Sequence, residues 1–418
     1  MIHFESFTLG NGLKVVVHED PSSQLAAVNV MYNVGARDEE VGKTGFAHLF
    51  EHLMFGGSQH ISSYDQALQQ VGGDNNAYTT PDVTNYYCTL PAANLATAFW
   101  LESDRMLGLS FDPQVLAVQQ QVVIEEFKER YLNQPYGYAW LKLSGLAYTV
   151  HPYRWPVIGQ DTSHIAQAAM EDVQAFSAKF YVPNNAILVV AGGVKLAQVK
   201  QLCQKWFEPI PAGPDYVRAL PQEPPQKTSR GITIEADVPL NAIYKAYHVP
   251  ARLSPAYHAV ELLCTGLGEG KSARLYKQLV EAKPYLNTVE AYTTQTADPG
   301  LLIISGTLNE GISFSQVEEV LLPILEAVQA QGLVATELAK AKNHAETDWV
   351  YTAVDLRYRA QALALATSLG DTNLVNNEME KIQGIAVEDV KRVARQVLAV
   401  ENSSTIYYRS TTSSAFGL

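Results

Sequence analysis

The chain has 418 residues, more than a single hydrophobic core usually organises, so we expect two or three domains. Hydrophobic residues make up 47% of the sequence and charged residues 17%, a balance that excludes a disordered chain. The 30 basic and 43 acidic residues give a net charge of −13, which argues against nucleic acid as the main partner.

Strands and helices alternate along the first half of the chain. Residues 13–20 and 26–36 are predicted strands on either side of a Pro-Ser-Ser turn. The segment 72–91 has two β-prone runs around a Thr-Pro-Asp turn, which predicts a hairpin. Further predicted elements are helices over about 93–107 and 113–132 and a buried strand within 186–194.

A proline-rich segment then divides the chain. Residues 207–231 hold six prolines and show little periodicity, as expected of a linker. The order of strands and helices recurs after it, which suggests duplication. The predicted fold class is α+β: two similar α/β domains, each a mainly antiparallel sheet with helices packed on it. We predict an N-terminal domain at 1–210 that carries the motif described below, a linker at 211–230, and a C-terminal domain at 231–418 that lacks it.

Cysteine usage and apolar runs indicate the kind of environment. Cys88, Cys203 and Cys264 are too few and too scattered for a disulfide framework, so we expect them to be buried. The longest apolar run, 186–194, is about half the length of a spanning helix, so no membrane span is expected. The N-terminus resembles a strand and a turn rather than an export signal, which predicts a cytoplasmic protein, or a periplasmic one if a signal peptide was removed.

The most informative pattern lies in residues 43–57. We expect a helix there, capped by Thr44 and ended by Gly56 or Gly57. One predicted face is apolar and consists of Phe46, Leu49, Phe50 and Leu53. The second face carries His48, Glu51, His52 and Phe55.

The second face has the residues of a metal site. Imidazoles four residues apart project from one side of a helix and can bind one zinc ion, while a glutamate beside them can take a proton from a zinc-bound water. His48, Glu51 and His52 occur in the order His-x-x-Glu-His of the inverzincin motif. Alternatively, these groups are simply satisfied by other partners in the core.

A hydrolytic zinc site needs a third protein ligand and an open position. The next long helix offers Glu126, close to a buried stripe that we expect Val115, Val118 and Val122 to form. Glu125 falls almost as close to that stripe, so periodicity does not choose between the two glutamates. The alternative for either glutamate is a solvated side chain, or one that lies next to the metal ligands without binding the metal.

These segments together are recognisable. Over essentially its whole length, and most densely in NGLKVVVHED, GFAHLFEHLMFGGS, GGDNNAYTTPDVTNYY and VVIEEFKERYLNQPYG, the chain resembles the pitrilysin/insulysin family of zinc peptidases. It is most similar to short bacterial members that are processing-peptidase-like. The resemblance implies that His48, His52 and Glu126 bind one Zn²⁺ per chain and that Glu51 is the general base.

The resemblance also implies roles outside the ligands. The family often has another glutamate seven residues before its third ligand, and this chain has Gln119 there, which can form hydrogen bonds but not carry charge. Glu125 is expected just outside the ligands. The hairpin resembles the family's edge strand beside the metal, where a peptide adds as an extra strand paired with Asn76, Ala77 and Tyr78. The alternative is an ordinary surface hairpin.

The second half departs from the family. There an Arg and, seven residues later, a Tyr usually hold the substrate carbonyl, and the matching positions are Val280 and Asn287, which cannot do so. Lys283 and Tyr285 lie at the wrong offsets and are expected to be structural. The resemblance therefore implies a heterodimer whose inactive, homologous sister subunit supplies the Arg and Tyr. A homodimer is the alternative.

The expected function is that of a zinc endopeptidase, the catalytic subunit of a heterodimer, that hydrolyses extended or unfolded peptides by metal-activated water. The expected partners are a peptide substrate and a second subunit. A non-catalytic assembly or scaffold subunit of the same fold is the main alternative, and a zinc hydrolase with another substrate is a third. His151, in a family-like segment, is expected to be a packing or turn residue.

Overall fold

A computed structural model of the protein describes residues 1–411, so 412–418 of the predicted C-terminal domain lie outside the described residues. Two compact units are present, and neither is continuous in sequence. The first unit comprises residues 1–127, 155–220 and 349–377. The second comprises 128–154, 221–348 and the chain from 378 onward.

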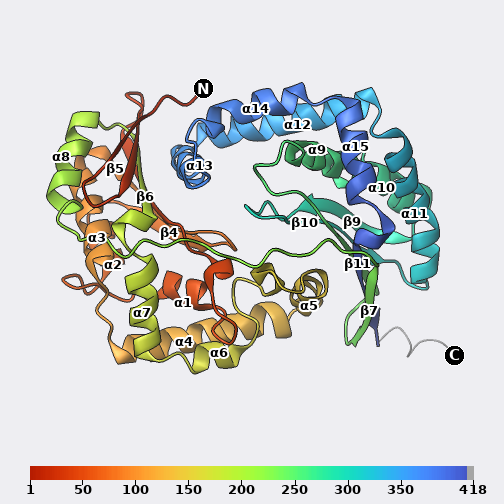
Figure 1. Ribbon diagram of the computed structural model, residues 1–418, viewed down its shortest axis with the longest axis horizontal. Coiled ribbons are helices and arrows are strands. Elements are labelled where there is room, and N and C mark those ends of the chain that lie inside the picture. The colour runs from red at the N-terminus through yellow and green to blue at the C-terminus, as the bar shows by residue number, and fades with distance from the viewer. Residues whose placement is uncertain (412–418) are drawn as a thin grey trace. The chain divides into compact units, whose positions relative to one another are not determined.

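The first unit contains a six-stranded mixed sheet in the order β1-β2-β6-β3-β5-β4, of which β4, β5 and β6 are labelled in Figure 1. β2 and β6 are parallel, and the other neighbouring strands are antiparallel. The strands are β1 (Glu5–Thr8), β2 (Lys14–Glu19), β3 (Leu25–Tyr32), β4 (Asp74–Thr79), β5 (Thr84–Pro91) and β6 (Ala186–Gly192). The predicted hairpin is therefore confirmed as β4 and β5, and β4 is an edge strand of the sheet.

Helices cover this sheet. On one face, Leu356 and Leu363 of α13 pack with Val16, Ile187 and Val189 of the central strands. Other helices also contact the strands: α1 contacts β4 and β5, α3 contacts β3 and β5, and α8 contacts β2. The helices are α1 (Phe46–Leu53), α2 (Tyr64–Gln69), α3 (Leu95–Leu107), α4 (Pro113–Phe127), α6 (Thr162–Ala166), α7 (Met170–Phe180), α8 (Leu196–Trp206) and α13 (Leu356–Ser368).

The second unit contains a five-stranded sheet in the order β7-β11-β8-β10-β9. β7 and β11 are parallel, and the remaining neighbours are antiparallel. The strands are β7 (Arg230–Ala236), β8 (Ala242–His248), β9 (Leu286–Thr293), β10 (Leu301–Leu308) and β11 (Ser403–Ser410). β9 is an edge strand of this sheet, as β4 is of the first.

The two faces of the second sheet bury different side chains, because successive residues of a strand point to opposite faces. Ile243 and Ile304 pack in the cluster that includes α9, α11 and α15, whereas Ala242 and Ile303 pack with α5. Figure 1 shows α9, α11 and α15 gathered beside this sheet. The fold is completed by α5 (Tyr138–Ala147), α9 (Tyr257–Gly268), α10 (Arg274–Tyr276), α11 (Phe314–Gln331), α12 (Ala335–Val354), α14 (Leu374–Gly384) and α15 (Val387–Val397). Two of the boundaries between the units fall within helices, one in α12 and one in α14.

The two sheets share one topology once β1 is set aside. In each, the five strands in chain order are arranged first-fifth-second-fourth-third, and the first and fifth strands are parallel. The predicted fold class, two similar α/β domains with mainly antiparallel sheets, is confirmed. The helices, however, are exchanged: α5 precedes the proline-rich segment but packs in the second unit, and α13 follows that segment but packs in the first.

The proline-rich segment has no helix or strand between Trp206 and Arg230 but is held in place by hydrogen bonds. Arg218 donates to Asp38 in the first unit, and in the second unit Glu223 accepts backbone N–H bonds from residues 149–151. The three cysteines are buried and free, as predicted. Within residues 1–411, no helix has both the length and the apolar character of a membrane span.

Candidate metal centre

Helix α1 carries the predicted motif and is anchored through its apolar face. Phe50 is fully buried, and its ring centroid lies 4.4 Å from that of Tyr181. Gly45 precedes the helix with φ of 90°, a left-handed conformation that favours glycine. The helix ends at Leu53, before the glycines predicted to end it. The predicted apolar stripe is confirmed, because Phe46, Leu49, Phe50 and Leu53 are all buried.

The start of α1 is capped by a residue that the sequence patterns did not single out. The Glu39 carboxylate accepts backbone N–H bonds from Gly45 at 2.9 Å and from Ala47 at 2.8 Å. Burial raises the pKa of Glu39 well above its usual value, and these two bonds oppose that shift. The prediction that Thr44 caps the helix is wrong, because the Thr44 hydroxyl instead lies 2.8 Å from Nδ1 of His164.

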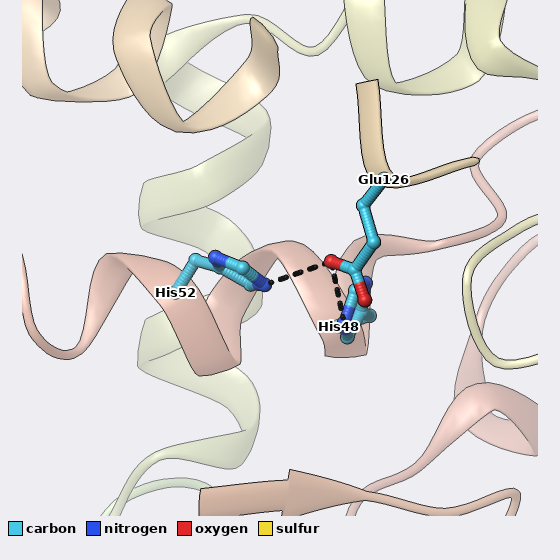
Figure 2. Close-up of side chains that lie close together, drawn as sticks. All are labelled: His48, His52 and Glu126. Carbon is cyan, nitrogen blue, oxygen red and sulfur yellow. Dashed lines mark ion pairs between the residues drawn. The ribbon is translucent and has the colours of Figure 1, made fainter. Parts of the chain in front are cut away.

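The structure brings His48 and His52 together with Glu126. The Oε2 atom of Glu126 lies 3.6 Å from Nε2 of His48 and 3.5 Å from Nε2 of His52. Figure 2 shows both imidazoles of α1 directed at this carboxylate, which comes from α4. The two imidazole rings are nearly perpendicular, at 83°, with centroids 4.9 Å apart.

The three side chains fit a zinc ion. Zinc binds histidine nitrogen at about 2.0–2.1 Å in tetrahedral geometry, which places neighbouring ligand atoms roughly 3.4 Å apart. The two nitrogen–oxygen distances are close to this value, and all three ligand atoms lie within 4.8 Å of one another. Within residues 1–411, this is the only cluster of its kind among His, Cys, Asp and Glu side chains. Two imidazoles and one carboxylate leave a fourth tetrahedral position for water or substrate.

The geometry distinguishes the two adjacent glutamates of α4. Glu125 is exposed, whereas Glu126 is half-buried and faces α1. The predicted stripe is wrong, however, because Val118 and Val122 are 57% and 43% exposed. The buried face of α4 is instead formed by Leu116, Val123, Ile124 and Phe127. Valines occur on both sides of this helix, so their spacing alone does not reveal which side packs against a neighbour.

Glu51 of α1 is tied to the end of strand β4. The Thr79 hydroxyl donates a hydrogen bond of 2.6 Å to Oε2 of Glu51. Asn75 lies four residues earlier, on the same side of the strand, and its side-chain NH₂ donates to Asp65 of α2. Ala77 lies between them and therefore also faces the helices. Tyr78 points to the opposite side, where its ring centroid lies 6.5 Å from that of Tyr87 and burial raises its pKa to about 12.

The hydrogen-bonding pattern of the β4–β5 hairpin shows which backbone groups of β4 face the free edge of the sheet. The Thr80 N–H donates to the carbonyl of Val83, and the hydrogen-bonded pairs alternate from there along the ladder. The backbone of Asn76 and Tyr78 therefore pairs with β5, while the backbone of Ala77 faces the free edge. In agreement, the Ala77 N–H is accepted by the side-chain oxygen of Asn76 at 2.8 Å.

Two other predicted residues have clear positions. Gln119 is half-buried on α4, seven residues before Glu126 and so on the same side of the helix. His151 lies in the second unit, where its Nδ1 accepts the Tyr153 N–H at 3.1 Å and its ring centroid lies 4.2 Å from that of Tyr153. The expectation that His151 is a packing or turn residue is confirmed.

In the second unit, the positions matched to the family's Arg and Tyr hold side chains without that chemistry. Val280 packs against the core of the unit from a short π-helix, Lys277–Ala282. Asn287 is exposed on the edge strand β9. Tyr285 packs against the same core, as expected of a structural residue, and Lys283 is exposed.

Comparisons with known proteins agree with this fold and site. Residues 14–143 match the model described as "Insulinase (Peptidase family M16)", and residues 168–344 match "Peptidase M16 inactive domain". The zinc protease PqqE of Helicobacter pylori is 29% identical over 97% of this chain and 92% of its own length. A probable mitochondrial-processing peptidase subunit beta of Arabidopsis thaliana is 25% identical over 70% of this chain and 57% of its own length.

A solved structure is equally similar. The crystal structure of a protease from Helicobacter pylori superposes with a TM-score of 0.91 at 29% identity, covering 98% of this chain and all of that one. Fold and site together define a peptidase-like protein with a histidine–histidine–glutamate centre. The chain belongs to the insulinase family of peptidases.

Proposed function

We propose that this protein is a zinc-dependent endopeptidase that hydrolyses extended or unfolded peptides and binds one Zn²⁺ per chain. The observation that carries the proposal is the approach of the Glu126 carboxylate to the imidazoles of His48 and His52, with Glu51 on the same helix. Membership of the insulinase family supports peptide hydrolysis, and the name of the Helicobacter pylori relative supports zinc as the metal.

In this proposal, His48, His52 and Glu126 are the zinc ligands and Glu51 is the general base. A zinc ion held by these three residues would supply polarisation of the scissile carbonyl and a lowered pKa of the attacking water. Glu51 takes the proton from that water and later passes it to the leaving amine. Gln119 and Glu125 lie outside the ligands, and neither exchanges a proton with the substrate.

The decisive experiment combines metal content with cleavage. We expect elemental analysis of the purified protein to find zinc, and a chelator to stop cleavage of an unfolded peptide. Glu51→Gln should keep the zinc and lower kcat by roughly 10²- to 10⁴-fold, the usual contribution of general acid–base catalysis. A protein without zinc that cleaves nothing, even with a partner subunit present, would contradict the proposal and favour the scaffold alternative.

We further propose that substrates bind by adding a strand to β4. The outward-facing backbone of Ala77 supports this: its N–H donates to the Asn76 side chain rather than to β5, so a carbonyl of an extended peptide can replace that side chain as the acceptor at the open edge. Ala77→Pro removes that N–H from the free edge without removing a bond to β5. Its KM for a long peptide should rise roughly 2- to 10-fold, the equivalent of one net hydrogen bond. An unchanged KM would show that substrates bind elsewhere.

The partner is also a proposal. Val280 and Asn287 lack the chemistry of Arg and Tyr, which supports a catalytic subunit that works with an inactive homologous sister subunit rather than as a homodimer. The subunit beta relative from Arabidopsis thaliana is consistent with a multi-subunit enzyme. Co-expression with the product of the neighbouring gene, followed by co-purification and peptidase assay, tests this. Full activity of the purified chain alone would exclude the heterodimer.

A further inference from the structure

The hydroxyl of Thr79 contacts Glu51 from the sheet, and the direction of the hydrogen bond between them is fixed by chemistry. A carboxylate can only accept hydrogen bonds, so Thr79 is the donor across the 2.6 Å between Oγ1 and Oε2 of Glu51. Hydrogen bonds from a neutral donor to an ionised carboxylate are short and roughly twice as strong as neutral ones. This bond therefore holds the Glu51 carboxylate at Oε2 and fixes its orientation relative to β4.

Thr79 is itself held in the β4–β5 hairpin by strand pairing and by the turn that follows it. It is the last residue of β4 and pairs with Thr84 of β5. In the turn that follows, the Thr80 hydroxyl accepts the N–H of Val83 at 3.0 Å and that of Asp82 at 3.1 Å. A β-branched side chain on such a strand has few χ1 rotamers, so the hydroxyl has little freedom to move away from the carboxylate.

We propose that Thr79 is a positioning residue for the reaction: its hydroxyl holds the Glu51 carboxylate in the orientation in which Glu51 takes the proton of the attacking water and returns it to the leaving amine. The inference rests on the proposed function. It also places the anchor of the base on the same strand, β4, whose free edge presents Ala77 to the substrate. One short strand thus orients both the peptide and the base that acts on it.

Three variants test the hydroxyl and nothing else. Thr79→Val keeps the shape and removes the donor, and Thr79→Ser keeps the donor. The matched control is Thr89→Val in β5, because the Thr89 hydroxyl is buried and has no hydrogen-bond partner within residues 1–411. All three proteins are compared with the wild type for zinc content, melting temperature, kcat and KM on one unfolded peptide.

We expect Thr79→Val to lower kcat roughly 10- to 100-fold, part of the general-base contribution, with KM within twofold and zinc content unchanged. Thr79→Ser should recover kcat to within about threefold of wild type, and Thr89→Val should leave both constants unchanged. A purely structural role for Thr79 would instead lower the melting temperature or the zinc content.

Two outcomes overturn the inference while leaving the proposed function intact. One is wild-type kcat in Thr79→Val, and the other is an equal loss of kcat in Thr79→Val and Thr79→Ser. If the zinc-loaded wild type cleaves no peptide, alone or with its partner, the proposed function fails and the role of Thr79 fails with it. The wild-type assay therefore separates failure of the function from failure of the inference.

Discussion

Glu126 is the one side chain of the candidate centre that comes from outside α1, so the centre depends on the packing of α4 against α1. Its carboxylate faces two imidazoles, while the adjacent Glu125 is exposed. The two residues have the same chemistry and are neighbours in the chain. They therefore form a natural pair for testing position alone.

Glu126→Gln should weaken zinc binding by more than the roughly 10- to 100-fold that loss of an outer partner of a metal ligand costs. The reason is that the substitution replaces an anionic ligand with a neutral amide. Glu125→Gln is the control and should bind zinc as the wild type does. Competition with a fluorescent chelator measures both affinities. An equal loss of zinc in the two variants would contradict the assignment of Glu126.

Single residues also show which parts of the candidate site helical periodicity can predict. The positions of His48, Glu51 and His52 follow from helical periodicity, because all three lie on one short helix. The choice between Glu125 and Glu126 depends on which face of α4 packs, and that face is set by α1 and α6 rather than by the sequence of α4. Glu39 and Thr79 act on α1 from a loop and a strand, so no local pattern could connect them with it.

At the scale of the element, α1 is a helix of eight residues. Glu39 holds its N-terminus, and Thr79 holds Glu51 on its polar face. Helices this short are marginal on their own, so tertiary contacts must supply most of their stability. The Glu39 carboxylate supplies acceptors for two N–H groups at the N-terminus, where a helix has no acceptors of its own. One of these N–H groups belongs to Ala47, the residue directly before His48.

Glu39→Gln should lower the free energy of unfolding by about 1–3 kcal/mol, because one buried N–H would then face an amide NH₂ instead of an oxygen. The neighbouring Glu40 is exposed, and Glu40→Gln should change stability by less than about 0.5 kcal/mol. Urea denaturation of both variants without metal measures the difference. Equal stabilities would show that the cap contributes nothing to holding α1.

At the scale of the whole molecule, the sequence predicts the duplication of the fold but not the exchange of two helices. The alternation of strands and helices and their recurrence after residue 231 predict two similar α/β halves, and the two sheets share one strand order. The exchange of α5 and α13 has no local signal, because an apolar helical stripe does not say which sheet it covers. Leu356 and Leu363 would pack equally well, by pattern alone, on the strands nearest to them in sequence.

The exchange of helices predicts how fragments behave. Residues 1–220 include all six strands of the first sheet but lack α13, which leaves Val16, Ile187 and Val189 without their cover. Leu356 and Leu363 alone stabilise the unit by about 1.5–3 kcal/mol each on burial. We therefore expect the 1–220 fragment to bind a hydrophobic dye and to melt without cooperativity.

A fusion of residues 1–220 to residues 349–377 through a flexible linker is the matched control. It restores α13 together with the Arg359 side chain, which donates to Asp20 at 2.8 Å, and the Asn376 side chain, which accepts the Ile2 N–H at 2.7 Å. Both fragments carry α5, so any difference between them is due to residues 349–377. The fusion should melt cooperatively and bind little dye. Cooperative melting of 1–220 alone, at the same temperature as the fusion, would show that α13 is dispensable and that the first sheet folds within the N-terminal half.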